Sequence, residues 1–80
     1  MTKQEWRQEQ RVKPIGVDGI AQCREIVERK QFAKVNEVMV DLFSASAIVK
    51  VYDAVNPVNQ AKMVTLPVAQ VASISFELLA

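Results

Sequence analysis

Histidine is missing from this chain of 80 residues, and cysteine occurs only once, at Cys23. The absence of histidine excludes a His-based general base, a serine-type catalytic triad and most zinc sites. One cysteine cannot form an internal disulfide or a cysteine-rich metal site, and this usage is typical of an intracellular, reduced protein. We therefore expect no cofactor, no metal ion and no enzymatic activity.

Long hydrophobic runs and an excess of one charge are missing as well. No apolar run approaches the ~20 residues of a membrane helix, and Thr2 to Lys13 are too polar for a signal peptide. The net charge is only +1, which gives no electrostatic reason to expect a nucleic acid or an anionic lipid as the partner. These features disfavour membrane and nucleic-acid partners.

Apolar side chains, in contrast, are plentiful and make up 50% of the residues. The length suits one small domain, and such a domain buries only ~60–65% of the surface of its unfolded chain. Some apolar surface should therefore remain exposed. Exposed apolar patches usually mark contacts with another protein or with a second copy.

The charged residues concentrate in the first half of the chain, which divides it into two parts. We interpret residues 1–16 as a charged N-terminal arm, either flexible or docked on a partner, and residues 17–80 as the compact domain. Trp6 is the only large aromatic residue of the arm, which Pro14 and Gly16 bring to an end. Trp6 either packs back onto the domain or inserts into a partner, as interface hot spots do.

The first part of the domain predicts a helix over residues 19–30, with Asp18 as its N-cap. Its expected inward face consists of Ile20, Cys23, Ile26 and Val27. On this face Cys23 is a small buried hydrophobe rather than a catalytic thiolate, since the chain has no histidine to lower its pKa.

The next segment predicts a β-hairpin that turns at Asn36-Glu37. Asn36 tolerates the positive φ of a tight turn, but Glu37 is a poor second residue where Gly would suit better, so we expect a strained or longer turn. Lys34 is within reach of Asp41 as a diagonal pair. The two faces should hold Ala33, Val35, Val38 and Val40 on one side, and Phe32, Lys34, Met39 and Asp41 on the other.

A helix over residues 45–55, with Ser44 as its expected N-cap, forms the centre of the predicted fold. Its polar residues lie in one narrow stripe, Ser46, Lys50 and Asp53, and the rest are apolar. A helix that is apolar on nearly all sides is almost buried. Tyr52 borders the stripe, where its ring can be buried and its hydroxyl wet. Asp41 and Asp53 are interpreted as a helix cap and a surface carboxylate, not as a catalytic pair.

The C-terminal part begins with Asn56-Pro57, which predicts a short helix over residues 58–64. Its expected inward residues are Val58, Ala61 and Val64. Beyond Pro67 two patterns compete, because residues 68–79 carry a helical stripe while residues 73–78 alternate as a strand does. The predicted fold class is α+β, a small, mostly helical domain with one β-hairpin packed on a central, nearly buried helix.

Several short sequences in the second half carry a resemblance to a known group. They are Val40-Asp41, Phe43-Ser44-Ala45-Ser46, Val51-Tyr52-Asp53-Ala54 and Leu66-Pro67-Val68. Through them the chain resembles, over residues 23–79, short uncharacterised proteins of bacteriophages and prophages, particularly those of actinobacterial hosts. That group has a Val-rich hairpin, VDxF(S/T)AS and a VYDA(L/V) helix, with Gly where Glu37 stands here. The resemblance implies phage origin and a helical last segment, and it supplies no activity.

Together these observations predict a non-enzymatic interaction or assembly protein that binds a host or phage protein, or associates with itself. The candidate binding residues are Trp6, Phe32, Met39 and Tyr52. The alternative is a small nucleic-acid-associated regulator, which would need the basic residues of the arm and first helix to converge. The interspersed glutamates are expected to leave no helix with a basic face. The expected location is the host cytoplasm, with the virion as the other location that fits such a role.

Overall fold

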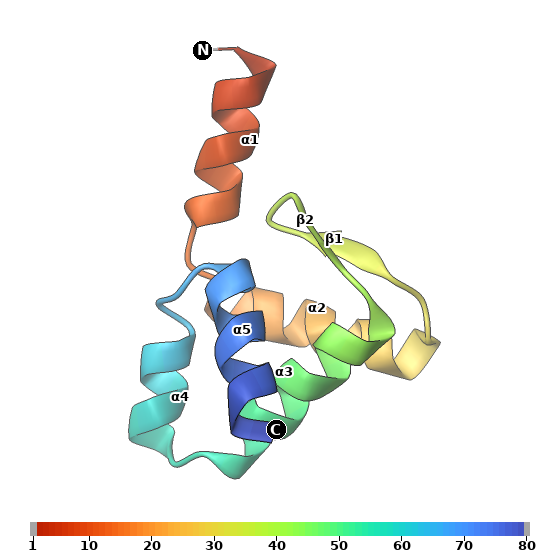
Figure 1. Ribbon diagram of the computed structural model, residues 1–80, viewed down its shortest axis with the longest axis vertical. Coiled ribbons are helices and arrows are strands. Elements are labelled where there is room, and N and C mark those ends of the chain that lie inside the picture. The colour runs from red at the N-terminus through yellow and green to blue at the C-terminus, as the bar shows by residue number, and fades with distance from the viewer. Residues whose placement is uncertain (1, 80) are drawn as a thin grey trace.

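The computed structural model describes residues 2–79, which form five helices and one two-stranded sheet (Figure 1). The helices are α1 (Lys3–Val12), α2 (Gly16–Arg29), α3 (Leu42–Ala54), α4 (Pro57–Met63) and α5 (Val68–Leu79). The strands β1 (Ala33–Val35) and β2 (Val38–Val40) lie between α2 and α3 along the chain. The protein is therefore the small, mostly helical α+β domain that its sequence predicts.

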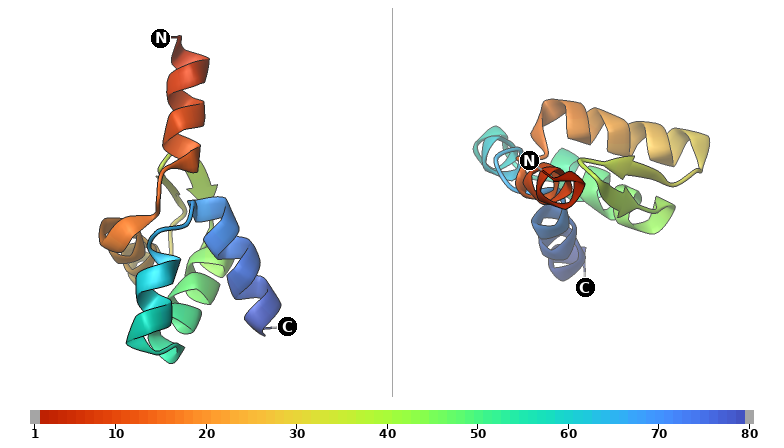
Figure 2. Two further views of the ribbon diagram at one scale, coloured as in Figure 1. Left: turned by 90° about the vertical axis from the view of Figure 1, so that its left-hand side faces the viewer. Right: turned by 90° about the horizontal axis from the view of Figure 1, so that it is seen from above.

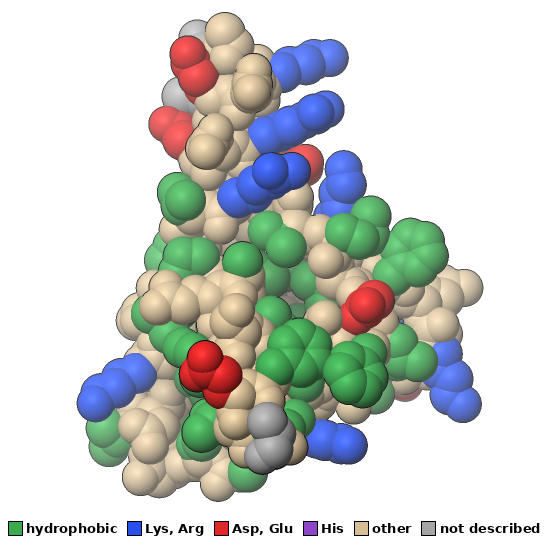
Figure 3. All heavy atoms as spheres, viewed as in Figure 1, with side chains coloured by type: hydrophobic (Ala, Val, Ile, Leu, Met, Phe, Trp, Pro, Cys, Tyr) green, Lys and Arg blue, Asp and Glu red, His purple; other side chains and the backbone are tan. Residues whose placement is uncertain are grey.

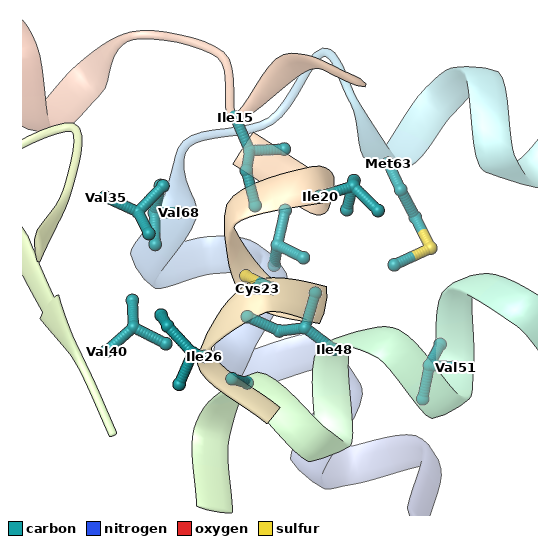
Figure 4. Close-up of a cluster of buried hydrophobic side chains, with 12 residues drawn as sticks. Ile15, Ile20, Cys23, Ile26, Val35, Val40, Ile48, Val51, Met63 and Val68 are labelled. Atoms are coloured by element: carbon teal, nitrogen blue, oxygen red, sulfur yellow. The ribbon is translucent and has the colours of Figure 1, made fainter. Parts of the chain in front are cut away.

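Helix α3 is the centre of the packing. Helices α2 and α5 lie on opposite sides of it (Figure 2) and make the most extensive contacts between elements. The buried residues of α3 are Ala45, Ala47, Ile48 and Val51. They form the core with Ile20, Cys23 and Ile26 of α2 and with Val68 and Val71 of α5 (Figure 4). The inward face predicted for α2 is confirmed, and close packing in this core fixes how the three helices are oriented.

The hairpin has the predicted register, with Lys34 opposite Met39 in an antiparallel pair. Asn36 and Glu37 have φ values of 49° and 60°, and two positive angles in succession are those of a two-residue type I′ turn. The turn is therefore not longer, although Glu37 adopts a backbone conformation that is unfavourable for a residue with a side chain. Val35 and Val40 are buried and attach the hairpin to the core.

Helix α2 begins earlier than predicted, at Gly16 rather than behind Asp18. No side chain caps this end, so the assignment of Asp18 as the N-cap is wrong. The N–H groups of Ile15 and Gly16 donate instead to the carbonyls of Leu66 and Val64, at 2.8 and 2.9 Å. Contacts distant in sequence thus satisfy two of the N–H groups at this helix start that have no partner within the helix.

Helix α3 also begins earlier, at Leu42, with Asp41 as its N-cap. The Asp41 carboxylate accepts a hydrogen bond from the Ser44 N–H at 2.7 Å. The capping role predicted for Asp41 is confirmed, whereas Ser44 as the N-cap is wrong. Lys34 does not pair with Asp41, since its ammonium lies 3.7 Å from the Glu37 carboxylate. The earlier start places Leu42 and Phe43 in the first turn of the helix.

Helix α4 has the predicted start, with Asn56 as its N-cap and Pro57 in its first turn. The predicted inward face is wrong for Val58 and Ala61, which are exposed, whereas Val64 is partly buried against the core and Met63 is the buried residue of the helix. A helix of seven residues has less than two turns. Its rotation is therefore determined by the contacts at its ends rather than by a repeating pattern.

The last segment is a helix, which settles the choice between helix and strand. Val68, Val71 and Ser75 are buried at helical spacing along α5. The Ser75 hydroxyl donates to the Val71 carbonyl at 2.7 Å, and this hydrogen bond allows a polar side chain to lie in the core.

The N-terminal arm contains helix α1, in which Thr2 and Glu5 form a capping box. None of the residues of α1 is buried, and the helix points away from the rest of the domain (Figure 1, Figure 2). The linker after α1 is attached to the domain, because the Asn36 amide donates to the Pro14 carbonyl at 3.1 Å and Ile15 is buried. Helix α1 thus projects from an anchored base.

Candidate interaction surface

A shallow cleft with aromatic walls lies between α3 and α5, and we refer to it as the aromatic cleft. Hydrophobic side chains gather between these helices in Figure 3. The rings of Phe43 and Phe76 stack, with centroids 5.5 Å apart and planes 18° from parallel. Phe43 is nevertheless 74% exposed. The cleft has a volume of about 230 Å³ and is lined by Phe43, Ser46, Ala47, Lys50, Phe76 and Leu79.

The aromatic cleft follows from the helical register of α3. Phe43, Ser46 and Lys50 are spaced by three and four residues, so they lie on one side of the helix. Ser46 and Lys50 belong to the polar stripe predicted from the sequence, and Phe43 continues the same side of the helix one turn toward the N-terminus. The sequence predicts Ser44 as the N-cap, which leaves Phe43 outside the predicted helix. The Asp41 cap is the signal that would have added Phe43 to the stripe.

The second wall of the aromatic cleft comes from the last turns of α5. Phe76 and Leu79 are three residues apart and lie beside the buried row that contains Ser75. The helical stripe in the sequence includes Leu79 but not Phe76. Sequence reasoning therefore missed Phe43 and Phe76, the two residues that define this surface.

The four residues predicted to bind a partner lie elsewhere and do not form one site. Phe32 is 68% exposed ahead of β1, and Met39 is 55% exposed on β2. Tyr52 is half-buried on α3, with the Arg24 guanidinium 6.0 Å from its ring centroid. Trp6 is 47% exposed on α1. None of them lines the aromatic cleft.

Helix α1 carries opposite charges on opposite sides. Lys3, Arg7 and Arg11 are each four residues apart and share one side, which we call the basic face. Glu5 and Glu9 lie on the other side, as the blue and red side chains of α1 show in Figure 3. The prediction that no helix carries a basic face is therefore wrong. Basic and acidic residues alternate along the sequence, but the helix places them on opposite sides.

Local surroundings shift the pKa values of two ionisable groups, Asp53 and Cys23. Arg24 donates two hydrogen bonds to Asp53, at 2.9 and 2.5 Å, and these bonds hold the pKa of the Asp53 carboxyl below its usual range. Burial raises the pKa of the Cys23 thiol to about 11. A thiol with such a pKa stays protonated near neutral pH, so Cys23 has the packing role that the sequence predicts.

Within residues 2–79, none of the helices has both the length and the hydrophobicity to cross a membrane. Comparison with known protein families, with curated proteins and with solved structures finds no match for this chain.

Proposed function

We propose that this chain is a non-enzymatic, phage-encoded interaction or assembly protein that binds another protein surface through its aromatic cleft. The observation that supports the proposal is the Phe43–Phe76 stack, in which the residue Phe43 remains 74% exposed. Aromatic side chains dominate the energy of protein interfaces because they bury much apolar area at little entropic cost. The host cytoplasm is the location proposed for this activity, and the virion fits an assembly role.

The test compares the wild type with Phe43→Ser and with the matched control Val58→Ser, which changes an exposed residue of α4. Each protein is measured by size exclusion with light scattering and is immobilised to capture proteins from a host lysate. We expect Phe43→Ser to lose the self-association or the captured protein, whereas Val58→Ser keeps it. Both variants should retain the melting temperature within a few degrees, because both side chains are exposed. A wild type that binds nothing, or a Phe43→Ser variant that binds unchanged, would contradict the proposal.

A second candidate function is that of a small nucleic-acid-associated regulator, and the basic face of α1 favours it. Lys3, Arg7 and Arg11 project from a helix that stands clear of the domain, with Gln4 and Gln8 beside them. In protein–DNA complexes, guanidinium and side-chain amide groups form hydrogen bonds with phosphates and with base edges. The net charge of +1 weighs against this candidate.

Retention on duplex DNA at a series of salt concentrations tests this candidate. Contacts from three cations should give a slope of log affinity against log salt of roughly −3. Arg7→Glu should abolish retention, whereas Lys62→Glu on α4 should reduce it far less. Retention that is absent at low salt, or equal in the two variants, would rule this function out.

A further inference from the structure

We propose that the aromatic cleft receives Trp6 from the α1 helix of a second copy, and that two copies exchange this contact reciprocally in a dimer. The inference rests on the proposed function, because it uses the same cleft and names its occupant.

Helix α1 lacks a partner within its own chain. None of its ten residues is buried, and within residues 2–79 its contacts with other elements are few and centre on α5. Isolated helices of this length are marginal in water even when capped, so packing against another surface would stabilise α1 further. Trp6 is its only aromatic residue and is 47% exposed. The side of α1 that carries Trp6 is therefore the side on which packing would add most.

The aromatic cleft of the same copy is out of reach of this helix. Helix α1 extends from the base of the domain away from the C-terminal end of α5, where Leu79 lines the cleft (Figure 1). The linker is held by hydrogen bonds from Ile15 and Gly16 to the connection before α5. The molecule is 39 Å long, and a helix of ten residues spans about 15 Å of that length. Only a second copy can bring an α1 helix to the cleft.

The size and the walls of the cleft suit one large aromatic side chain. Its volume of about 230 Å³ is below the roughly 300 Å³ at which small-molecule pockets begin. An apolar cavity of roughly 150 Å³ admits a benzene ring, so an indole is of matching size. The Phe43 and Phe76 rings offer it faces and edges to stack against. The Ser46 hydroxyl on the wall can accept the indole N–H.

One charge beside Trp6, on Glu9, complements the edge of the cleft. Lys50 lines the cleft and has no ion-pair partner among residues 2–79. Glu9 follows Trp6 by three residues, so the two side chains are neighbours on the surface of α1. An indole seated in the cleft thus brings the Glu9 carboxylate toward the Lys50 ammonium. Lys3 precedes Trp6 by three residues and is its neighbour on the opposite flank, so this pairing requires the orientation of α1 that turns Glu9 toward Lys50. Arg7 lies about 100° around the helix from Trp6.

Reciprocal exchange uses both the α1 helix and the aromatic cleft of each copy. Each copy carries one donor, the α1 helix, and one acceptor, the aromatic cleft. A two-fold arrangement fills both clefts and leaves no open end, whereas one-way docking would continue into chains. The expected product is therefore a closed dimer.

Trp6 is the only tryptophan in the sequence, so its emission reports on its own environment. The full chain is diluted through a concentration series, and the emission of tryptophan is recorded alongside the native mass from light scattering. We expect the mass to rise from monomer to dimer with concentration, and the emission to move to shorter wavelength over the same range. Emission that stays constant while the mass doubles would overturn the proposal.

Four variants test the contacts in the dimer. Trp6→Ala should weaken dimer formation roughly thirtyfold or more, the range of an interface hot spot. Lys50→Glu and Glu9→Lys should each weaken it by about fivefold, and their combination should restore it, since the pair is then reversed. Val58→Ser serves as the matched control and should leave the dimer unchanged.

The outcomes separate this inference from the proposed function. A dimer that is lost in Phe43→Ser but kept in Trp6→Ala contradicts the exchange of α1 while supporting binding through the cleft. A monomer at every concentration overturns the inference, and the capture experiment with Phe43→Ser then decides the proposed function alone. Failure of the double charge reversal to restore the dimer contradicts the predicted orientation of α1.

Discussion

At the scale of single residues, short-range hydrogen bonds lower the pKa values of two carboxyls, Asp41 and Asp53, whereas burial raises the pKa of the Cys23 thiol. The Ser44 N–H and hydroxyl hold the pKa of the Asp41 carboxyl below its usual range, and Arg24 does the same for Asp53. Both carboxylates are exposed to solvent. A carboxyl whose pKa is lower in the folded state stabilises the fold when ionised, and this contribution is lost as the pH falls through the folded-state pKa.

The first prediction concerns the pH dependence that Asp41 confers. Replacing it by Asn keeps a good N-cap but removes the titration. Wild-type stability should fall progressively below about pH 5 as the carboxyl takes up a proton, and Asp41→Asn should show a shallower decline. Urea unfolding followed by circular dichroism over a pH series measures both. Glu28→Gln, on the exposed side of α2, is the control and should follow the wild type. Parallel curves for the wild type and Asp41→Asn would contradict the predicted role.

At the scale of elements, the sequence predicts helices well where their caps are local and poorly where distant contacts define their ends. The Asn56 cap and the buried stripe of α2 follow from neighbouring residues alone. The start of α2 does not, because it depends on hydrogen bonds to Val64 and Leu66. For α3, Asp41 and Ser44 are both good N-cap residues, and composition alone does not choose between them.

The second prediction concerns the stability of the hairpin turn at Glu37. Glu37 has a φ of 60°, which costs a residue with a side chain about 1–2 kcal/mol. Glycine avoids this cost but adds roughly 0.5–1 kcal/mol of backbone entropy in the unfolded chain. Glu37→Gly should therefore stabilise the domain by about 0.5–1 kcal/mol in urea unfolding.

Two further variants control for the side chains of this turn. Asn36→Gly should change stability less, because Asn tolerates positive φ. Lys34→Ala removes the ion pair with Glu37 and should also have little effect, since the Lys34 side chain is exposed and the pair is long, at 3.7 Å. A loss of stability in Glu37→Gly that equals the loss in Lys34→Ala would show that the ion pair outweighs the backbone strain.

At the scale of the whole molecule, the sequence predicts the core better than the surface. Ile20, Cys23 and Ile26 are recognised by their periodicity, because burial repeats along one helix. The aromatic cleft requires Phe43 of α3 and Phe76 of α5, which are far apart in sequence and meet only after both helices pack. A pair of this kind has no periodic signature along the chain, so the structure is needed to identify it.

The last prediction follows from the projection of α1. Since none of its residues is buried, its amides should exchange with solvent almost as fast as those of an unfolded chain when the protein is dilute and monomeric. The amides of α3 should exchange slowest, because this helix packs on both sides. Hydrogen exchange at low and high protein concentration measures both helices. Docking of α1 on a second copy should slow exchange in α1 as the concentration rises and leave α3 unchanged. Slow exchange in α1 at the lowest concentration would instead require a contact within one chain that stabilises this helix.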